Sequence, residues 1–96
     1  MAARREMLRV FAYDITSDRR RAKVAAVLEE VAVRVQLSVF EARLSHREVA
    51  AVVARLRPLL TGEDRLRVYT IGADGLAHCR AVGGPPLPEK EDFWLL

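Results

Sequence analysis

The sequence predicts a single α+β domain in which two helices cover one face of an antiparallel sheet. Three observations support this prediction. The chain has 96 residues, of which 51% are hydrophobic, which is enough for one small core. Apolar residues alternate in some segments and recur every three or four residues in others, which distinguishes strands from helices. These segments follow one another as strand, helix, extended pair, helix and strand.

The first strand is predicted over residues 8–13, where odd and even positions alike carry hydrophobic side chains apart from Arg9. Because successive strand residues point to opposite faces, both faces of this strand are apolar and need cover. Residues 16–18 are helix N-cap types, and the helix is expected to run from there to about Ala32.

The extended pair is predicted over residues 33–44. Apolar residues occupy odd positions up to Val39 and even positions from Phe40 onward. A one-residue slip exchanges the two faces of a strand. We therefore expect a bulge or a break into two strands near Ser38.

A second helix is predicted to begin at Ser45. Ser45 and Glu48 have the capping-box spacing, with serine at the N-cap and glutamate three residues later. Pro58 lacks a backbone donor and disfavours helical geometry in the residue before it. This helix should therefore end or distort at Pro58.

The C-terminal part of the domain is predicted as a strand over residues 65–71, a hairpin turn at Asp74-Gly75 and a final strand over residues 76–82. The complete order is βαββαβ with an extra C-terminal strand, which is the ferredoxin-like plan. This plan leaves one sheet face open. Because the first strand is apolar on both faces, we expect a second copy of the chain to cover the open face in a homodimer.

The two ends of the chain differ in composition from the middle. Residues 1–6 are expected to be a flexible N-terminal extension, and residues 7–82 the ferredoxin-like domain. Residues 83–96 are predicted as a Pro/Gly linker and an apolar C-terminal tail. An apolar tail of this kind docks on its own dimer or on another protein.

The charge balance is compatible with a polyanionic partner. The formal net charge is +3, and fourteen of the sixteen cationic residues are arginines, which form bidentate contacts with phosphate. A GC-rich genome would give the same arginine bias, so composition leaves both explanations open. The single cysteine, Cys79, fits a reducing cytoplasm. No apolar run approaches the ~20 residues that span a membrane, so a cytoplasmic protein without a membrane partner is expected.

Several catalytic motifs are missing from the sequence. No glycine-rich phosphate loop is present, and Cys79, His46 and His78 do not have zinc-ligand spacing. His78 and Cys79 are adjacent in a predicted strand, so their side chains would point to opposite faces and would not form a nucleophile pair.

Asp14 is the acidic residue of interest, because it stands where an apolar strand ends. As a turn residue, it would accept hydrogen bonds from backbone N–H groups. A lone carboxylate is a poor magnesium site, since such sites combine one or two carboxylates with water and substrate phosphates. In a homodimer whose axis passes near the strand end, two copies of Asp14 would face one Mg²⁺ ion, which could bridge a phosphate and activate water.

Cationic and aromatic residues accompany Asp14. Arg19, Arg20 and Arg21 crowd the start of the first helix, where the helix dipole disfavours cations. This unfavourable placement indicates another role, such as phosphate binding. Tyr13 and Phe40 lie near strand ends, where bases could stack on them. Core packing is the other role open to both rings.

Two segments carry a resemblance to a known family. The first is Tyr-Asp-Ile-Thr-Ser-Asp-Arg-Arg-Arg at 13–21, and the second is Arg-Val-Gln-Leu-Ser-Val-Phe-Glu at 34–41, followed by Leu44. At this separation they resemble the CRISPR-associated protein two family, the small subunit of the spacer-acquisition complex. The resemblance extends from about Leu8 to Val82.

The resemblance implies a ferredoxin-like homodimer whose final strand crosses to the partner subunit. This dimer would bridge the CRISPR integrase subunits and hold captured duplex DNA. Members are also described as magnesium-dependent endonucleases that act on RNA or duplex DNA, so single-stranded RNA is a further candidate partner. Asp14 carries over as the catalytic, metal-binding acid. The other matched positions linked to the site are Tyr13, Arg21, Arg34 and Phe40.

Three functions remain open at this point. The first is a DNA-holding adaptor in which Asp14 is catalytically dispensable. The second is a magnesium-dependent endonuclease that uses paired Asp14 carboxylates. The third is a related toxin-like metal-dependent ribonuclease outside any CRISPR locus.

Overall fold

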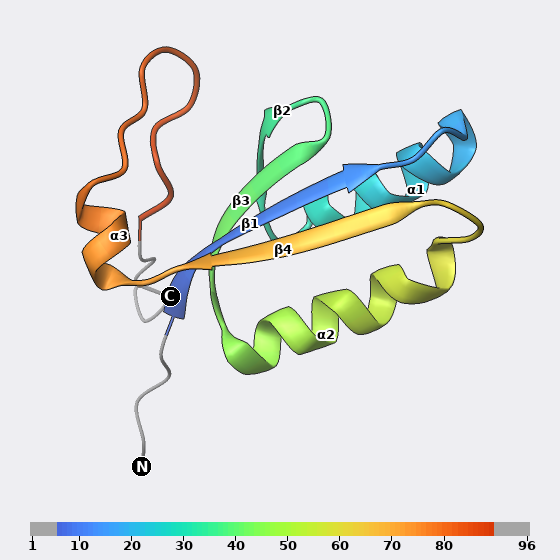
Figure 1. Cartoon of the computed structure of the whole chain (residues 1–96), viewed down its shortest axis with the longest axis horizontal. Helices are drawn as coiled ribbons and strands as arrows, with labels where there is room; N and C mark the ends of the chain where they lie inside the picture. The colour runs from blue at the N-terminus through green and yellow to red at the C-terminus, as the bar shows by residue number, and fades with distance from the viewer. Residues whose placement is uncertain (1–5, 90–96) are drawn as a thin grey trace.

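Residues 6–89, which the computed structural model describes, form four antiparallel strands, three helices and a short 3₁₀ turn (Figure 1). The strand order in the sheet is β2-β3-β1-β4, so β1 pairs with both β3 and β4. The predicted ferredoxin-like α+β fold is therefore confirmed. In chain order, the elements are β1 (Glu6–Asp14), α1 (Asp18–Glu29), β2 (Val33–Gln36), β3 (Val39–Ser45), α2 (His46–Leu56), η1 (Arg57–Leu59), β4 (Arg65–Ile71) and α3 (Ala73–Ala77).

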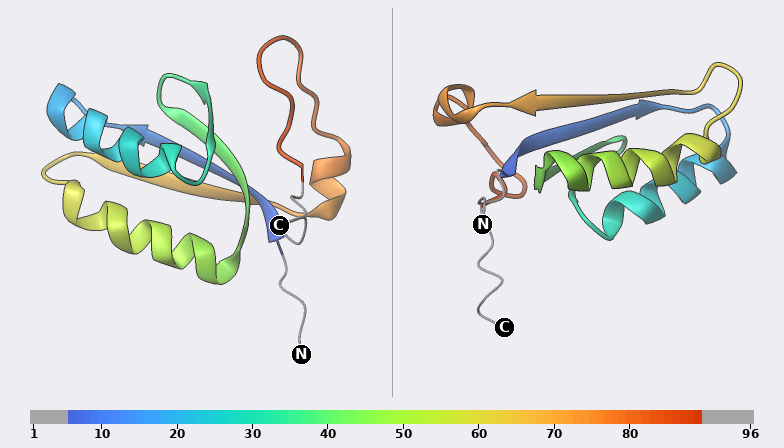
Figure 2. Two further views of the ribbon diagram at one scale, coloured as in Figure 1. Left: turned by 180° about the vertical axis from the view of Figure 1, so that it is seen from behind. Right: turned by 90° about the horizontal axis from the view of Figure 1, so that it is seen from below.

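Helices α1 and α2 lie against one face of the sheet, as the view from below shows (Figure 2). The hydrophobic core lies between these two layers. Phe11 of β1 and Phe40 of β3 are register partners, and both are fully buried. Leu28 of α1 and Leu56 of α2 belong to the same buried cluster. One face of β1 is thus covered by helices, as its apolar pattern requires.

The predicted helix signals are present. Ser17 caps α1 by accepting a hydrogen bond from the backbone N–H of Arg20. Ser45 and Glu48 form the reciprocal capping box at the start of α2. These bonds satisfy backbone donors that have no partner within the first turn of a helix. α2 ends at Leu56, and the chain continues through η1, which contains Pro58, so the helix ends before the proline as predicted.

The predicted break between the two extended segments is also confirmed. β2 ends at Gln36 and β3 begins at Val39, and the pairing register shifts between Arg34 and Gln36. The backbone N–H of Tyr13 donates to the carbonyl of Ser38 at 3.1 Å. This bond ties the β2–β3 turn to the carboxyl end of β1.

Helix α1 is shorter than predicted. It ends at Glu29 and does not continue to Ala32. The backbone N–H groups of Val31 and Ala32 both donate to the carbonyl of Leu28, at 3.0 and 2.8 Å. This tight turn reverses the chain early, which allows β2 to begin at Val33.

The predicted C-terminal hairpin is wrong. In place of a turn at Asp74-Gly75 and a strand over residues 76–82, the chain forms α3 and then an irregular segment. A strand over residues 76–82 would have paired with the free edge of β4, but the described sheet ends at β4 and Ala73–Ala77 form α3. Alanine and leucine in this segment are good helix formers. His78 and Cys79 therefore follow a short helix and do not lie in a strand.

The two ends of the chain lie partly outside the described residues. β1 already includes Glu6, which pairs with Ser45, one residue before the predicted start of the domain. The rest of the expected N-terminal extension, residues 1–5, and the end of the expected apolar tail, residues 90–96, fall outside the described range. The described part of the linker, residues 83–89, has no helix or strand.

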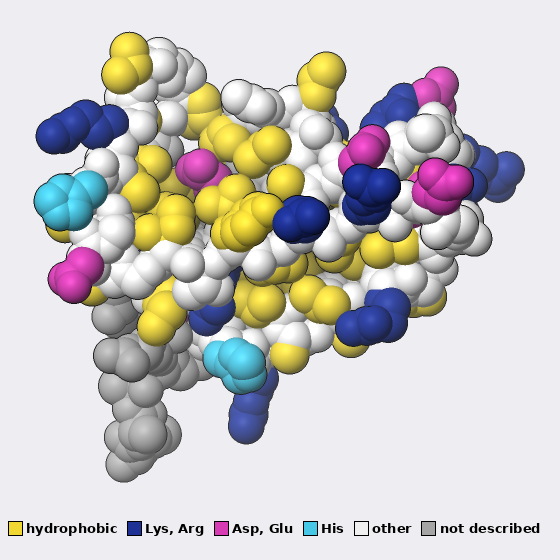
Figure 3. All heavy atoms as spheres, viewed as in Figure 1, with side chains coloured by type: hydrophobic (Ala, Val, Ile, Leu, Met, Phe, Trp, Pro, Cys, Tyr) yellow, Lys and Arg dark blue, Asp and Glu magenta, His cyan; other side chains and the backbone are white. Residues whose placement is uncertain are grey.

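The sheet face opposite the helices is open in the single chain. Val10 and Ala12 of β1, Val39 of β3 and Tyr69 of β4 share this face through the pairing register. Figure 3 looks onto this side and shows hydrophobic side chains gathered over the middle of the sheet. Tyr69 is 50% exposed. The apolar centre of this face is therefore available to a partner surface.

Candidate nucleic-acid and metal site

A cavity of about 500 Å³ lies where β1 ends, α1 begins and the β2–β3 turn folds over. The structure brings together four residues singled out from the sequence here: Tyr13, Asp14, Arg21 and Arg34. The other lining residues are Ile15, Asp18, Ala22, Leu37 and Ser38. The fold thus joins the two segments that carry the family resemblance in one place.

The Asp14 carboxylate is exposed, and it forms no hydrogen bond or ion pair with any described residue. The turn role, in which it would accept backbone N–H bonds, is therefore not observed in the described chain. An ionised carboxylate without a partner keeps all its lone pairs for a ligand. Asp14 is thus free to hold a cation at the end of β1.

The cavity also contains Asp18, for which the sequence predicted only a capping role. Asp18 accepts a hydrogen bond from Nη2 of Arg21. Nη1 of Arg21 donates to the carbonyls of Ile15 and Thr16, at 2.7 and 3.3 Å. The guanidinium of Arg21 therefore mainly closes the β1–α1 loop. The spacing of Asp18 and Arg21, three residues apart on a helix, was the available sequence signal for this pair.

Arg34 lies over the ring of Phe40, with its Cζ 5.1 Å from the ring centroid. A guanidinium in this position is attracted to the negative face of the ring. Among the described residues, its charged partner is Glu29, with 3.5 Å between Nη1 and Oε2. The guanidinium forms no hydrogen bond with a described residue. Arg34 therefore offers the cavity an oriented cation with unused donors.

The rings of Tyr13 and Phe40 belong to the core. They are 6% and 0% exposed, and they stack with 6.3 Å between ring centroids. The Tyr13 hydroxyl donates to the carbonyl of Leu37 at 3.2 Å. Rings packed in this way have no free face for a base, so the geometry favours core packing over base stacking. Through these contacts, the two rings position Arg34 and the β2–β3 turn.

Arg19 and Arg20 do not line this cavity. Nε and Nη2 of Arg20 donate to the two carboxylate oxygens of Asp64, at 2.7 and 3.2 Å. The hydrogen-bonded Arg20 guanidinium lowers the pKa of Asp64, and the backbone N–H of Thr61 acts in the same direction. The same hydrogen bond raises the pKa of Arg20. Arg20 is thus occupied in holding α1 against the loop before β4, whereas Arg19 is exposed.

The described part of one chain supplies only part of the ligand set that a metal ion needs. Within residues 6–89, no group of three His, Cys, Asp or Glu side chains is arranged to hold a metal. Asp14 has the hard oxygen donors that Mg²⁺ prefers, but it is a single free carboxylate. The donor chemistry of Asp14 therefore fits Mg²⁺, but the described part of one chain supplies this carboxylate alone.

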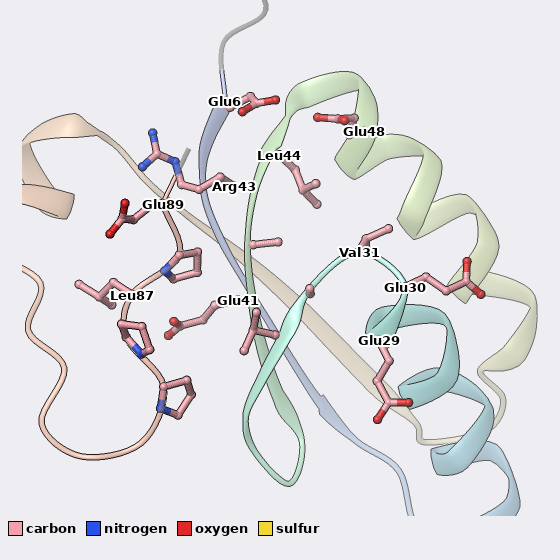
Figure 4. A pocket seen from close by; sticks show the side chains of 16 residues that line it. Glu6, Glu29, Glu30, Val31, Glu41, Arg43, Leu44, Glu48, Leu87 and Glu89 are labelled. Carbon is pink, nitrogen blue, oxygen red and sulfur yellow. The ribbon is translucent and has the colours of Figure 1, made fainter. Parts of the chain in front are cut away.

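A second cavity, of about 670 Å³, lies between the end of α1, β3 and Pro85–Glu89 (Figure 4). Its wall is rich in carboxylates: Glu6, Glu29, Glu30, Glu41, Glu48 and Glu89. Its basic lining residue is Arg43, whose Nε is buried without a hydrogen-bond partner. Because carboxylates repel phosphate, this cavity does not suit a nucleic acid.

The sequence matches a known family over most of its length. The model described as CRISPR associated protein Cas2 matches residues 7–78. The chain belongs to the Cas2 family. The matched range includes every residue that lines the cavity around Asp14, so the resemblance seen in those two segments is confirmed.

Two relatives from this Cas2 family cover most of the chain. The "CRISPR-associated endoribonuclease Cas2 3" of Synechocystis sp. is 44% identical over 81 residues, which are 83% of this chain and 88% of that protein. The "CRISPR-associated endonuclease Cas2 2" of Thermus thermophilus is 41% identical over 86 residues, which are 88% and 91% of the two chains. The names of these relatives thus specify nuclease activity.

Solved structures show the same fold. The hypothetical protein TT1823 from Thermus thermophilus superposes with a TM-score of 0.74 at 41% identity, covering 88% of this chain and 99% of that chain. A chain of a "Partial Cas6-RT-Cas1--Cas2 complex" superposes with a TM-score of 0.63 at 27% identity, covering 83% and 94%. Among the described helices, none is long and apolar enough to cross a membrane.

Proposed function

We propose that this Cas2-family protein is a CRISPR adaptation subunit that dimerises, bridges integrase subunits and holds duplex DNA during spacer acquisition. Family membership is the observation that carries the proposal. Similarity to a chain in a complex that also names Cas1 supports an integrase partner. In this role the protein holds DNA through charge and shape, so the Asp14 carboxylate is not required for it.

The open sheet face supports the proposed dimer. Val10, Ala12 and Val39 give it an apolar centre that no helix of the described chain covers. A domain of this size buries a limited share of its apolar surface alone. A two-fold copy of the same face is complementary to itself. In the proposed dimer, the axis passes near the carboxyl ends of the β1 strands, where the two Asp14 residues face one another.

Free cations support a duplex DNA partner. Several exposed cationic residues form no ion pair within the described chain: Arg19, Lys23, Arg47, Arg57 and Arg65. Cations of this kind neutralise phosphates and release counterions without reading the sequence of the DNA. Binding should therefore be weakly sequence-dependent and should weaken steeply as salt is added.

Magnesium-dependent endonuclease activity is a second candidate function. The unpartnered carboxylate of Asp14 favours it, because a strand-end acid without a structural partner is poised for a ligand. The nuclease names of the relatives point the same way. When bound by the two Asp14 residues of a dimer, Mg²⁺ would supply a Lewis acid for a phosphodiester and lower the pKa of water. Arg34 would orient the phosphate beside Asp14.

Reconstitution with the purified integrase subunit tests the proposed function. The two proteins should form one complex, and the complex should integrate a labelled duplex into a repeat-containing plasmid. Integration should fall to background when this chain is left out. Absence of a complex, together with cleavage of RNA by this chain alone, would favour the toxin-like ribonuclease. Genes that neighbour this one give an independent check, since an integrase gene and a repeat array accompany an adaptation subunit.

A further inference from the structure

The arginines near the cavity differ in how many of their donors are already used. Arg20 donates hydrogen bonds to both carboxylate oxygens of Asp64. Arg21 donates to two backbone carbonyls and to the Asp18 carboxylate. Arg34 forms no hydrogen bond with a described residue, although it lines the cavity beside Asp14. Of these three, Arg34 is therefore the guanidinium that has donors left for a phosphodiester.

Two packed rings hold the Arg34 guanidinium in place. Phe40 is fully buried and presents its face to Arg34, and Tyr13 stacks against Phe40 from the core. Arg34 and Phe40 are also cross-strand partners in the β2–β3 pair. A guanidinium that is already oriented loses less side-chain entropy when it binds phosphate.

Glu29, at the end of α1, forms only a weak ion pair with Arg34. A single contact of 3.5 Å joins the two side chains, which are 41% exposed for Arg34 and 56% for Glu29. A phosphate would instead accept two short, charge-assisted hydrogen bonds from the same guanidinium. A carboxylate and a phosphate cannot both occupy that position without repulsion.

We propose that the Glu29 carboxylate competes with phosphate for Arg34, and that this competition sets the affinity of the Asp14 cavity for nucleic acid. The inference rests on the proposed nucleic-acid role of this cavity. A phosphodiester that binds Arg34 displaces the Glu29 carboxylate into solvent. Loss of the negative charge at Glu29 therefore tightens binding, whereas loss of Arg34 removes both the binding group and the competition.

Glu30 provides a matched control for Glu29. Its side chain points away from that of Glu29 (Figure 4) and accepts two hydrogen bonds from Arg55 of α2, at 3.0 and 3.2 Å. Glu29→Gln and Glu30→Gln therefore change the net charge equally, at adjacent positions. Only the first removes a carboxylate from a cation of the cavity.

The test measures the dissociation constant of a short fluorescein-labelled duplex DNA for the full chain, by anisotropy at low salt. Wild type, Glu29→Gln and Glu30→Gln are compared, each with Arg34 and with Arg34→Ala. We expect Glu29→Gln to bind about two- to fivefold more tightly than Glu30→Gln, the range of an exposed ion pair. In the Arg34→Ala background, this difference should disappear. Circular dichroism verifies that all six proteins are folded.

Two results would overturn the inference. Equal dissociation constants for Glu29→Gln and Glu30→Gln would show that only net charge matters. A gain for Glu29→Gln that persists without Arg34 would show that Glu29 acts on another group. Either result leaves the proposed function intact if the wild type binds DNA. Failure of the wild-type protein to bind duplex DNA at any salt concentration would overturn both the inference and DNA holding.

Discussion

Arg20 and Asp64 form a bidentate ion pair that joins the start of α1 to the loop before β4. The Asp64 side chain is 3% exposed, and its Oδ2 also accepts the backbone N–H of Thr61 at 3.0 Å. Asp18 and Arg21 lie in the same helical turn as Arg20. This ion pair therefore holds one wall of the cavity that contains Asp14.

Asp64→Asn should lower the free energy of unfolding and should make that free energy depend less on pH in the acidic range. The Arg20 hydrogen bond lowers the pKa of Asp64 in the folded state, so the wild type gains stability above the unfolded pKa of about 3.9. That stability is lost as the pH falls through the folded pKa. Urea unfolding at neutral pH and across the acidic range should show a smaller loss on acidification for Asp64→Asn.

Glu63→Gln is the matched control, because Glu63 is the exposed neighbour of Asp64 and has no partner among the described residues. Its urea midpoint should follow that of the wild type at every pH. Equal midpoints for Asp64→Asn and Glu63→Gln would mean that the ion pair does not stabilise the start of α1.

Phe40→Leu should weaken nucleic-acid binding more than Phe11→Leu. Both phenylalanines are fully buried and face each other across β1 and β3, so each substitution should cost about 1–2 kcal/mol of unfolding free energy. Only Phe40 contacts the Arg34 guanidinium. Urea unfolding should therefore give similar losses, while anisotropy gives a larger dissociation constant for Phe40→Leu alone. Similar dissociation constants for the two variants would show that Phe40 does not position Arg34 for binding.

Tyr69→Glu should disrupt the proposed dimer. Tyr69 lies on the open sheet face and is half exposed in the single chain, and burying a charge in an apolar interface is costly. Light scattering after gel filtration should give the monomer mass for this variant. Ala54→Glu adds the same charge on an exposed position of α2 and should keep the dimer mass. A dimeric Tyr69→Glu protein would place the interface elsewhere.

Much of the fold was predictable because the determining residues are close in the chain. The serine caps, the break at Pro58 and the phase change between Val39 and Phe40 each depend on a few adjacent residues. The C-terminal hairpin was not predictable in this way. Alternation over residues 76–82 is compatible with a strand on the free edge of β4, but Ala73–Ala77 form α3. A short apolar pattern does not decide between a strand and a helix.

The candidate site was predictable in part. The strand-end position of Asp14 and the resemblance of two segments identified four residues that do line one cavity. The roles of the arginines were not predictable. Arg20 and Asp64 are 44 residues apart in the sequence, so only the folded chain reveals that Arg20 is occupied. The contact between Arg34 and the Phe40 ring likewise depends on the β2–β3 register.

Asp14→Asn should abolish magnesium-dependent cleavage without lowering stability. Asp14 has no partner among the described residues, so its removal should change the unfolding free energy by no more than about 0.5 kcal/mol. Cleavage of labelled RNA and duplex DNA is measured with Mg²⁺ and with EDTA. The wild type should cleave only with Mg²⁺, and the variant should not cleave. Unchanged cleavage by Asp14→Asn would exclude the nuclease site proposed here.

Spacer integration by Asp14→Asn tests the adaptor function most directly. The variant is combined with the purified integrase subunit, and integration of a labelled duplex into a repeat-containing plasmid is compared with that of the wild type. The adaptor function predicts equal integration, because DNA is held by charge and shape while the Asp14 carboxylate is dispensable. Lost integration by a variant that is still dimeric and still bound to the integrase would contradict it.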